Sequence, residues 1–278
     1  MSVAGKATVG VVGLGAMGRP AAELLAAAGH PTWVFDTDPD AVHAATSRGA
    51  TASATLRELG AASSVILVFV PTDDDVLAVC SEEIGVLADA VAGSVVMICS
   101  SVRPETCRAV ASVAAAHGVE VLDAALTGGV RAAEAGTVNL LVGGDGTVLD
   151  KVRPVLEPWC GTVHLLGALG AGQVGKTVNN LCHWGQLSVI VEALRLGRRL
   201  GVEPELLRAA MMDAPPASRT LQEMQLMRLT WHEKDLANAM RMARSVEADL
   251  PVASTVQEAM RHITVADIAD LYAPPDRR

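Results

Sequence analysis

Two short segments of the chain contain residues whose types and spacing suit chemistry. Near the start, the run Gly13-Leu14-Gly15-Ala16-Met17-Gly18 has three glycines at the spacing that lets a backbone approach a dinucleotide pyrophosphate. Past the middle, Lys176-Thr177-Val178-Asn179-Asn180 contains an amine and an amide that one helix face would bring together. Together the segments predict an enzyme that moves a hydride to or from a bound nicotinamide while an amine handles the proton on the substrate oxygen.

The glycine run has the sequence context of a cofactor site. It directly follows an apolar, β-branched run at residues 7–12 and opens a helical pattern at residues 16–28. Asp36, at the end of the next expected strand, can accept hydrogen bonds from the adenosine ribose hydroxyls, whereas a 2′-phosphate there would meet its charge and that of Asp38. We therefore expect NAD rather than NADP; the alternative is that Asp36 only caps a turn before Pro39.

Lys176 and Asn180 could together contact one substrate hydroxyl, because positions i and i+4 of a helix share a face and Asn179 points elsewhere. A lysine ordinarily titrates near 10.4, so a general base near neutrality needs desolvation or a nearby positive charge, which an oxidised nicotinamide ring could supply. The alternative is a solvated helix lysine with no role in chemistry.

The elements expected around these residues alternate between strands and helices. Apolar strand candidates recur at residues 7–12, 32–35, 65–70, 94–98, 119–122 and 138–142. Helical segments between most of them predict a mostly parallel, doubly wound α/β sheet of the Rossmann type, covered on both faces. From Leu165 to Ala266 only helical periodicity remains, which predicts an all-α C-terminal domain.

The predicted domains are a NAD-binding domain at residues 1–166 and a helical substrate and dimerisation domain at residues 167–278. A run of glycines predicts a hinge between them: Gly167, Gly170, Gly172 and Gly175. A proline-free stretch from Gly172 to about Leu200 predicts a long interdomain helix that could also form a subunit interface. Pro204 is expected in a first helical turn, and Pro215-Pro216 as a break.

Composition narrows the class of partner. The formal net charge of −9, with scattered basic residues, argues against a nucleic-acid or anionic-membrane surface and leaves a small molecule as the expected partner. Residues 1–6 lack an apolar signal core, and the longest apolar strand, 65–70, is far shorter than the roughly 20 residues of a membrane helix. These two observations predict a cytoplasmic protein. The five cysteines show no paired C-x-x-C spacing, which predicts reduced, mostly buried thiols and no metal site.

Four ordered motifs resemble those of the β-hydroxyacid dehydrogenases, the group of 3-hydroxyisobutyrate dehydrogenase and tartronate semialdehyde reductase. They are the start Val9–Gly18, the segment Asp123–Gly129 continuing to Ala135-Gly136-Thr137, the segment Gly170–Asn180, and Lys234-Asp235-Leu236. The resemblance covers nearly the whole chain and implies a two-domain fold, with a helical second domain like that of 6-phosphogluconate dehydrogenase.

The resemblance also implies roles for residues at matching positions. Lys176 takes the place of the family's catalytic lysine and Asn180 that of its substrate-binding asparagine, while Thr127, Gly128 and Gly129 take the place of the cradle for the substrate carboxylate. The expected cofactor site comprises Gly13, Leu14, Gly15, Ala16, Met17, Gly18, Asp36, Val70, Pro71, Ser101 and Lys234. The alternatives are a plain glycine turn at 127–129 and a surface helix position for Lys234. A homodimer or homotetramer is expected.

The chain departs from the family pattern at several points. Where members usually have an acidic residue before Ser-Thr, it has Met97-Ile98-Cys99-Ser100-Ser101, so the local network beside the nicotinamide is in doubt. His183 and Trp184 replace smaller residues after Asn180 and could line a pocket for a bulkier or more polar substrate, or could only pack.

Arg131 could bind a second anionic group or be solvated. Asp73-Asp74-Asp75 is expected to start a helix rather than bind a metal.

The sequence thus predicts an NAD-dependent dehydrogenase of a small β-hydroxy acid, with Lys176 as the general acid/base and semialdehyde reduction as the reverse reaction. One alternative is an imine reductase of the same fold, which usually replaces the lysine and favours NADPH. Another is a protein that binds NAD(H) as a sensor without catalysis. The sequence does not name the acid.

Overall fold

The computed structural model of the chain describes residues 6–273. The chain divides into two compact units, a sheet unit at Met1–Lys176 and a helical unit at Thr177–Arg278. The domain boundary expected between residues 166 and 167 stays a prediction, because the start of the helix that follows it belongs to the sheet unit. Residues 1–5, part of the segment considered for a signal peptide, lie outside the described range.

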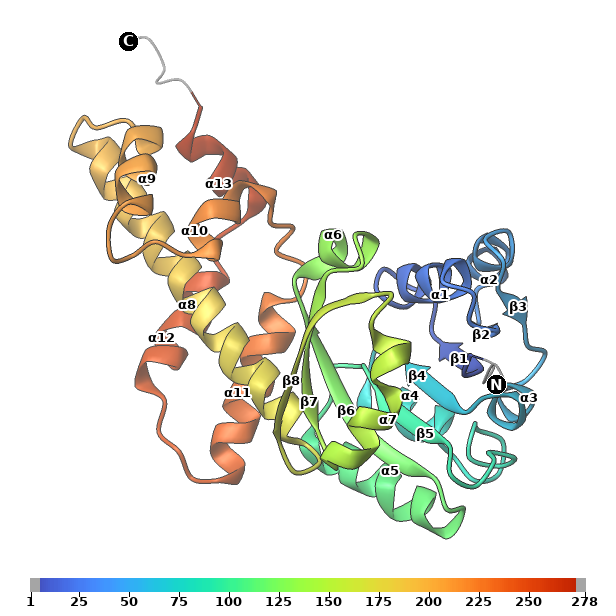
Figure 1. Ribbon diagram of the computed structural model, residues 1–278. Coiled ribbons are helices and arrows are strands. Elements are labelled where there is room, and N and C mark those ends of the chain that lie inside the picture. The colour runs from blue at the N-terminus through green and yellow to red at the C-terminus, as the bar shows by residue number, and fades with distance from the viewer. Residues whose placement is uncertain (1–5, 274–278) are drawn as a thin grey trace. The chain divides into compact units, whose positions relative to one another are not determined.

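Within the described residues, the sheet unit contains one eight-stranded sheet in the order β3-β2-β1-β4-β5-β6-β7-β8. The strands are β1 (Val9–Val12), β2 (Thr32–Phe35), β3 (Thr51–Ala52), β4 (Val65–Val68), β5 (Val95–Ile98), β6 (Glu120–Thr127), β7 (Val138–Gly143) and β8 (Cys160–Gly167). All neighbouring strands are parallel except β6 and β7, which are antiparallel. The predicted mostly parallel, doubly wound sheet is confirmed (Figure 1).

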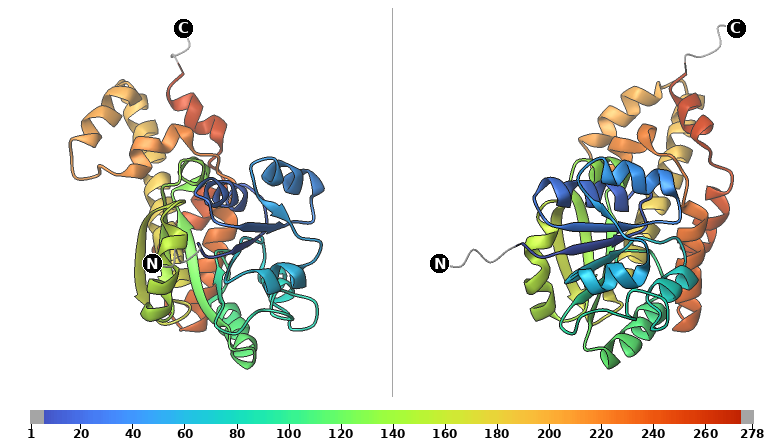
Figure 2. Two further views of the ribbon diagram at one scale, coloured as in Figure 1. Left: turned by 45° about the vertical axis from the view of Figure 1, so that its right-hand side comes forward. Right: turned by 90° about the vertical axis from the view of Figure 1, so that its right-hand side faces the viewer.

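Helices connect the strands of the sheet unit. They are α1 (Gly18–Ala27), α2 (Pro39–Thr46), α3 (Leu56–Ala62), α4 (Asp73–Val79), α5 (Pro104–Ala116), α6 (Gly129–Glu134) and α7 (Gly146–Leu156). One apolar cluster joins the sheet to residues of α1, α2, α6 and α7, and a second cluster joins it to α3, α4 and α5. The two clusters lie on opposite faces of the sheet, with helices over both (Figure 2).

Alternate residues of the central strands serve these two faces. In β4, Val65 and Leu67 belong to the first cluster, whereas Ile66 and Val68 belong to the second. Because both faces are covered, every residue of such a strand is apolar, and this is why the strands stand out as short continuous apolar runs.

Two strands were not expected from the sequence. β3 has only two residues, both exposed, and pairs with β2 alone. β8 is an edge strand of eight residues that pairs only with β7, and most of its residues are exposed. Neither has the buried apolar run by which the other strands are recognisable, because burial on one face or none leaves no such run.

The described part of the helical unit is all α, as predicted. It begins within α8 (Ala171–Arg199), and the remaining elements are α9 (Pro204–Met212), α10 (Arg219–Glu223), a 3₁₀ turn η1 (Met224–Leu226), α11 (His232–Ser245), α12 (Pro251–Met260) and α13 (Val265–Leu271). The 29 residues of α8 agree within one residue at each end with the predicted long helix. Pro204 and Pro251 start their helices, where a missing N–H costs no hydrogen bond.

The predicted glycine hinge is wrong at Gly172 and Gly175, which lie inside the first turns of α8. A Cβ atom at Gly172 would lie 2.2 Å from the carbonyl oxygen of Leu141, and one at Gly175 would lie 2.3 Å from Leu166 Cδ1. Gly172 therefore allows α8 to approach the backbone of β7 closely, and it serves packing rather than bending. At Gly175 the nearest atom belongs to an exposed leucine side chain, which can move.

All five cysteines are free, and Cys80, Cys99 and Cys107 are buried. Burial raises the pKa of the Cys80 thiol to about 12. Residues 6–273 include no group of three His, Cys, Asp or Glu side chains arranged to hold a metal ion. No helix in this range combines the length and the apolar character needed to cross a membrane.

We expect Gly172→Ala to lower the free energy of unfolding by about 1–3 kcal/mol, because the added methyl group meets backbone that can yield only by shifting the helix from the strand. Gly185→Ala is the matched control in the same helix, since the nearest atom to its Cβ is Val256 Cγ2 at 3.7 Å. That variant should gain about 0.5–1 kcal/mol from helix propensity. Urea denaturation of both variants checks this, and equal stabilities would contradict the close-packing role.

Candidate active site

The turn after β1 uses its three glycines in three ways. Gly13 has φ of +88°, and a Cβ there would lie 2.5 Å from the carbonyl oxygen of Phe69. A Cβ at Gly18 would lie 1.9 Å from the carbonyl oxygen of Gly13, so this glycine lets α1 start against the strand. Gly15 has no other group within 4 Å of its Cβ position. The turn is thus closed on the protein side and open at Gly15, as an approach to a pyrophosphate requires.

The other residues of the turn differ in exposure. Ala16 is exposed and Met17 half-buried, next to the first turn of α1, where backbone N–H groups face an anion favourably. Leu14 is 2% exposed and its side chain packs in the core, so this residue contributes through its backbone. The Leu14 N–H donates to Asp36 Oδ2 at 2.5 Å.

Asp36 directly follows β2 and is half-buried. Besides Leu14, it accepts a hydrogen bond at Oδ1 from the Asp38 N–H, at 2.8 Å. The carboxylate is therefore fixed beside the glycine turn, and each oxygen has capacity for a further hydrogen bond from a ribose hydroxyl. The open Gly15, the helix start and this carboxylate together fit a dinucleotide bound across the ends of β1 and β2.

The loops after β4 and β5 are joined through Ser100. The Val70 N–H donates to Ser100 Oγ at 2.8 Å, and Ser100 Oγ in turn donates to the Val68 carbonyl at 3.3 Å. Ser100 is 5% exposed, whereas the predicted cofactor residue Ser101 is half-buried. Sequence reasoning did not assign a role to Ser100, although the alternation of a strand continued past Ile98 would have distinguished the two serines.

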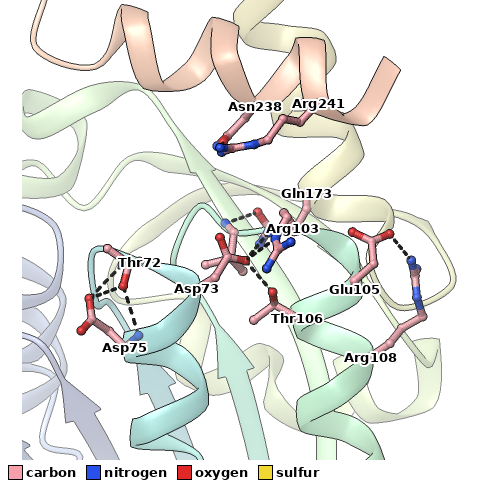
Figure 3. Close-up of polar contacts among 11 residues, drawn as sticks. Thr72, Asp73, Asp75, Arg103, Glu105, Thr106, Arg108, Gln173, Asn238 and Arg241 are labelled. Carbon is pink, nitrogen blue, oxygen red and sulfur yellow. Dashed lines mark hydrogen bonds and ion pairs between the residues drawn. The ribbon is translucent and has the colours of Figure 1, made fainter. Parts of the chain in front are cut away.

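Asp73 joins the starts of α4 and α5 (Figure 3). Its Oδ1 accepts hydrogen bonds from the Arg103 N–H at 2.9 Å and from Thr106 Oγ1 at 2.5 Å. Partial burial opposes ionisation, but these bonds outweigh it and lower the pKa of Asp73. Thr72 and Asp75 form a capping box, so the acidic run starts a helix as predicted.

The predicted carboxylate cradle lies where β6 ends. Thr127 is the last residue of the strand and is half-buried, and the exposed Gly128 and Gly129 have φ of +108° and +70°. A Cβ at Gly129 would meet nothing within 4 Å, so its backbone is accessible. This arrangement can present N–H groups and one hydroxyl to an anion. Arg131, exposed on α6, stays a prediction.

Lys176 lies in the second turn of α8 and is half-buried, at the limit of the sheet unit. Asn180 follows one helical turn later and is 6% exposed. Its Oδ1 accepts a hydrogen bond from Asn179 Nδ2 at 3.0 Å, which orients the Asn180 amide. The amine and the amide thus share a face of one continuous helix, as predicted.

His183 and Trp184 have different environments in the helical unit. His183 is half-buried, with Nδ1 2.9 Å from Thr220 Oγ1. Trp184 is 7% exposed and belongs to the apolar core of the unit, where its Nε1 donates to Asp235 Oδ2 at 3.2 Å. This burial favours the packing alternative for Trp184, whereas substrate contact by either residue stays a prediction.

The three residues of the Lys234-Asp235-Leu236 motif have different environments. Leu236 is 1% exposed in the core, and the hydrogen bond from Trp184 holds Asp235. Lys234 is exposed in the first turn of α11. Its role toward a cofactor stays a prediction.

Comparison with known proteins places most of the chain in recognised families. Residues 8–167 match the model for the NAD binding domain of 6-phosphogluconate dehydrogenase. Residues 170–271 match the model described as NAD-binding of NADP-dependent 3-hydroxyisobutyrate dehydrogenase. Two different family models thus cover the two parts of the chain in order.

Full-length relatives agree with these models. The 3-hydroxyisobutyrate dehydrogenase of Pseudomonas aeruginosa is 33% identical over 263 residues, which cover 88% of this chain and 88% of the relative. The 2-hydroxy-3-oxopropionate reductase of Escherichia coli is 32% identical over 260 residues, covering 90% and 89%. The solved structure of the Mycobacterium tuberculosis 3-hydroxyisobutyrate dehydrogenase with L-serine has a TM-score of 0.85 at 29% identity, covering 96% of this chain and 100% of that one. Imine reductases share the fold at 22% identity or below.

We expect Asp36→Asn to reduce the preference for NAD over NADP, because it removes the charge that opposes a 2′-phosphate while keeping an acceptor for the Leu14 N–H. The ratio of kcat/KM for the two cofactors should fall at least about tenfold. Asp40→Asn, an exposed acid in the first turn of α2, is the control and should leave the ratio unchanged. An unchanged ratio in Asp36→Asn would remove Asp36 as the selector.

Proposed function

The chain belongs to the β-hydroxyacid dehydrogenase family, and on that basis we propose the reaction that it catalyses and the residues responsible. It is an NAD-dependent dehydrogenase acting on a CH–OH group. Its substrate is a small β-hydroxy acid, oxidised at the hydroxyl carbon, and the reverse reaction reduces a semialdehyde.

The relatives support this substrate class. The Pseudomonas aeruginosa enzyme is named for 3-hydroxyisobutyrate, and the Mycobacterium tuberculosis structure contains L-serine. Both compounds have a hydroxyl group on the carbon β to a carboxylate. The shared pattern is an anionic group and a hydroxyl group at a fixed separation, which one cradle and one proton-transferring residue can recognise together.

NAD, when bound, accepts the hydride at its nicotinamide ring or returns it from there. The turn at Gly13–Gly18 would hold its phosphates, and the carboxylate of Asp36 would hold its adenosine ribose. Val70, Pro71 and Ser101, in the loops after β4 and β5, would hold its nicotinamide half. Lys234 contributes from α11.

Lys176 is the general acid/base. In the oxidation direction its amine accepts the hydroxyl proton as the hydride leaves the same carbon, and in reduction it returns that proton to the carbonyl oxygen. Asn180, one turn further along α8, orients the oxygen. Thr127, Gly128 and Gly129 bind the carboxylate, so that the reacting carbon is held in one position during transfer.

One observation supports this assignment above the others: Lys176, the glycine turn and the carboxylate cradle all belong to the sheet unit, and α8 continues from Lys176 to Asn180 without a break. The helix spacing predicted from sequence is therefore present. An imine reductase or a non-catalytic sensor would leave this combination of an amine, an amide and an anion cradle without a use.

The assignment of Lys176 is tested by measuring nicotinamide absorbance when the protein and NAD meet a panel of 3-hydroxy acids. Lys176→Ala should lower kcat about 10²–10⁴-fold, because proton transfer is lost, and should retain NADH binding. Lys151→Ala, an exposed lysine of α7, is the matched control and should be unaffected. Full activity in Lys176→Ala would remove the lysine from the mechanism.

The same panel separates the alternatives. Reduction of a cyclic imine with NADPH, without turnover of any hydroxy acid, would indicate an imine reductase. Tight NADH binding with no turnover of either class would indicate a sensor.

We also propose a cytoplasmic homo-oligomer. The five free cysteines support a reducing compartment, which cell fractionation tests. Val189 and Leu196 of α8, and Leu200 directly after its end, are 62%, 61% and 74% exposed. The Leu200 N–H donates to the Leu196 carbonyl at 3.1 Å, so spacings of seven and four residues place all three on one side of the helix. An exposed apolar stripe of this kind supports contact with a second copy.

Sedimentation velocity should therefore give a mass that is a multiple of 28.7 kDa. Leu196→Glu should shift the distribution toward the monomer, because it places a charge in the apolar stripe. A monomeric wild-type protein would contradict the oligomer.

A further inference from the structure

A buried polar network lies at the start of α8, and neither of its two main residues belongs to the proposed active site. Its members are Gln173, 2% exposed, and Asp123, fully buried in β6. Both belong to the sheet unit. Buried polar groups of this kind cost free energy unless they are hydrogen-bonded, so their partners indicate what they position.

The side-chain amide of Gln173 contacts the loop after β5 at two points. Its Oε1 accepts a hydrogen bond from the Val102 N–H at 3.1 Å, and its Nε2 donates to the Ser100 carbonyl at 2.9 Å. These two peptide groups flank Ser101. Figure 3 shows Gln173 beside Arg103, the residue that follows this loop. One amide therefore fixes the backbone on both sides of Ser101.

Asp123 holds the backbone at the start of α8, from which the Gln173 side chain extends to the loop after β5. Its Oδ1 accepts a hydrogen bond from the Gly170 N–H at 2.5 Å, and its Oδ2 accepts one from the Gln173 N–H at 2.9 Å. A Cβ at Gly143 would lie 2.3 Å from Oδ1, and one at Gly172 would lie 2.7 Å from Oδ2. Glycines at both positions thus leave room for the carboxylate to bind the first turn of α8.

The sheet register explains why these groups meet. Ile98, the last residue of β5, pairs with Asp123 of β6, and Asp123 pairs with Gly143 of β7. Gly143 in turn pairs with Gly167 at the end of β8, four residues before α8 begins. The loop after β5 and the start of α8 are therefore neighbours across Asp123.

The loop after β5 lies on the side of the sheet where the nicotinamide half of the cofactor belongs. Asp36 follows β2 on one side of β1, whereas β4 and β5 lie on the other side. A dinucleotide with its adenosine ribose at Asp36 extends its other nucleoside toward the ends of β4 and β5. Lys176 follows Gln173 by three residues, about 4.5 Å along the helix axis.

We propose that Gln173 is a positioning residue for hydride transfer: its buried amide fixes the Ser100–Val102 loop to the first turn of α8. It thereby sets the position of the loop beside the nicotinamide relative to the helix that presents Lys176. Asp123 supports it by fixing that turn on β6. This inference rests on the proposed function, since it concerns the same reacting centre.

Substitutions of Gln173 distinguish a role in positioning the Ser100–Val102 loop from a role in only filling space in the core. Gln173→Leu keeps a similar volume and loses the side-chain hydrogen bonds to the Val102 N–H and the Ser100 carbonyl. Gln173→Glu keeps the acceptor for the Val102 N–H but places an oxygen against the Ser100 carbonyl, so one bond becomes a repulsion. Gln186→Leu is the matched control, because Gln186 is an exposed glutamine on the same helix.

Three kinds of measurement are made on each full-length variant. The first is kcat, KM and NADH affinity, the second is the primary deuterium isotope effect with substrate deuterated at the hydroxyl carbon, and the third is deuterium uptake of residues 99–103 without cofactor. For Gln173→Leu and Gln173→Glu we expect kcat to fall roughly 10- to 100-fold, with substrate KM and NADH affinity little changed. The isotope effect should rise as hydride transfer becomes rate-limiting, and uptake at 99–103 should be faster. Gln186→Leu should match the wild type in all three.

The inference is overturned if folded Gln173→Leu keeps the wild-type kcat and isotope effect, whatever happens to deuterium uptake. It is also overturned if activity falls only in proportion to loss of folded protein, with an unchanged isotope effect in the fraction that remains. Should Gln173→Leu fail to fold, Gln173→Glu decides by the same criteria. Lys176→Ala is assayed in parallel: its full activity would count against the proposed function, while the Gln173 variants still report on the loop.

Discussion

The start of α8 depends on one buried carboxylate. A fully buried Asp123 would be costly if unpaired, and the unsatisfied N–H groups of a helix start would be costly in the same place. The carboxylate of Asp123 accepts hydrogen bonds from the Gly170 and Gln173 N–H groups, so neither the carboxylate nor these N–H groups are left unsatisfied. Burial raises the pKa of Asp123 while these bonds oppose that rise, so the carboxyl group and the helix start stabilise each other only when both are in place. This contact holds the first turn of α8 against β6.

The topology of the sheet brings the segments of the proposed active site to the same edge of the sheet. β1, β2, β4, β5 and β6 are parallel, so their carboxyl ends point the same way and carry the glycine turn, Asp36, the loops after β4 and β5, and Thr127. β6 continues four residues past the pairing of Asp123 with Ile98, which separates the buried anchor from the exposed cradle. The reversal between β6 and β7 then returns the chain to the anchor, where α8 starts. The middle of β6 thus holds the start of α8, and its end leads into the proposed carboxylate cradle at Thr127, Gly128 and Gly129.

Sequence reasoning succeeded where the signal was local. The short apolar strands, the glycine turn at Gly13–Gly18, the long helix and the helical second unit are all present, because burial on both faces and helical periodicity are properties of neighbouring residues. It failed where neither property applies, at the edge strand β8 and the two-residue β3. It also misjudged Gly172 and Gly175, since a glycine inside a helix and a glycine at a hinge look alike in a sequence.

The sequence by itself determined the family, the cofactor motif and the pairing of Lys176 with Asn180 on one helix face, because each depends on residue types at fixed short spacings. Only the tertiary structure decided that Trp184 is a core residue holding Asp235, and that Gln173 reaches the loop around Ser101. Gln173 and Ser100 are 73 residues apart in the chain, and their contact depends on the order and register of three strands between them. No local pattern encodes such a contact, because its hydrogen bonds form only after the sheet has brought the two backbones together.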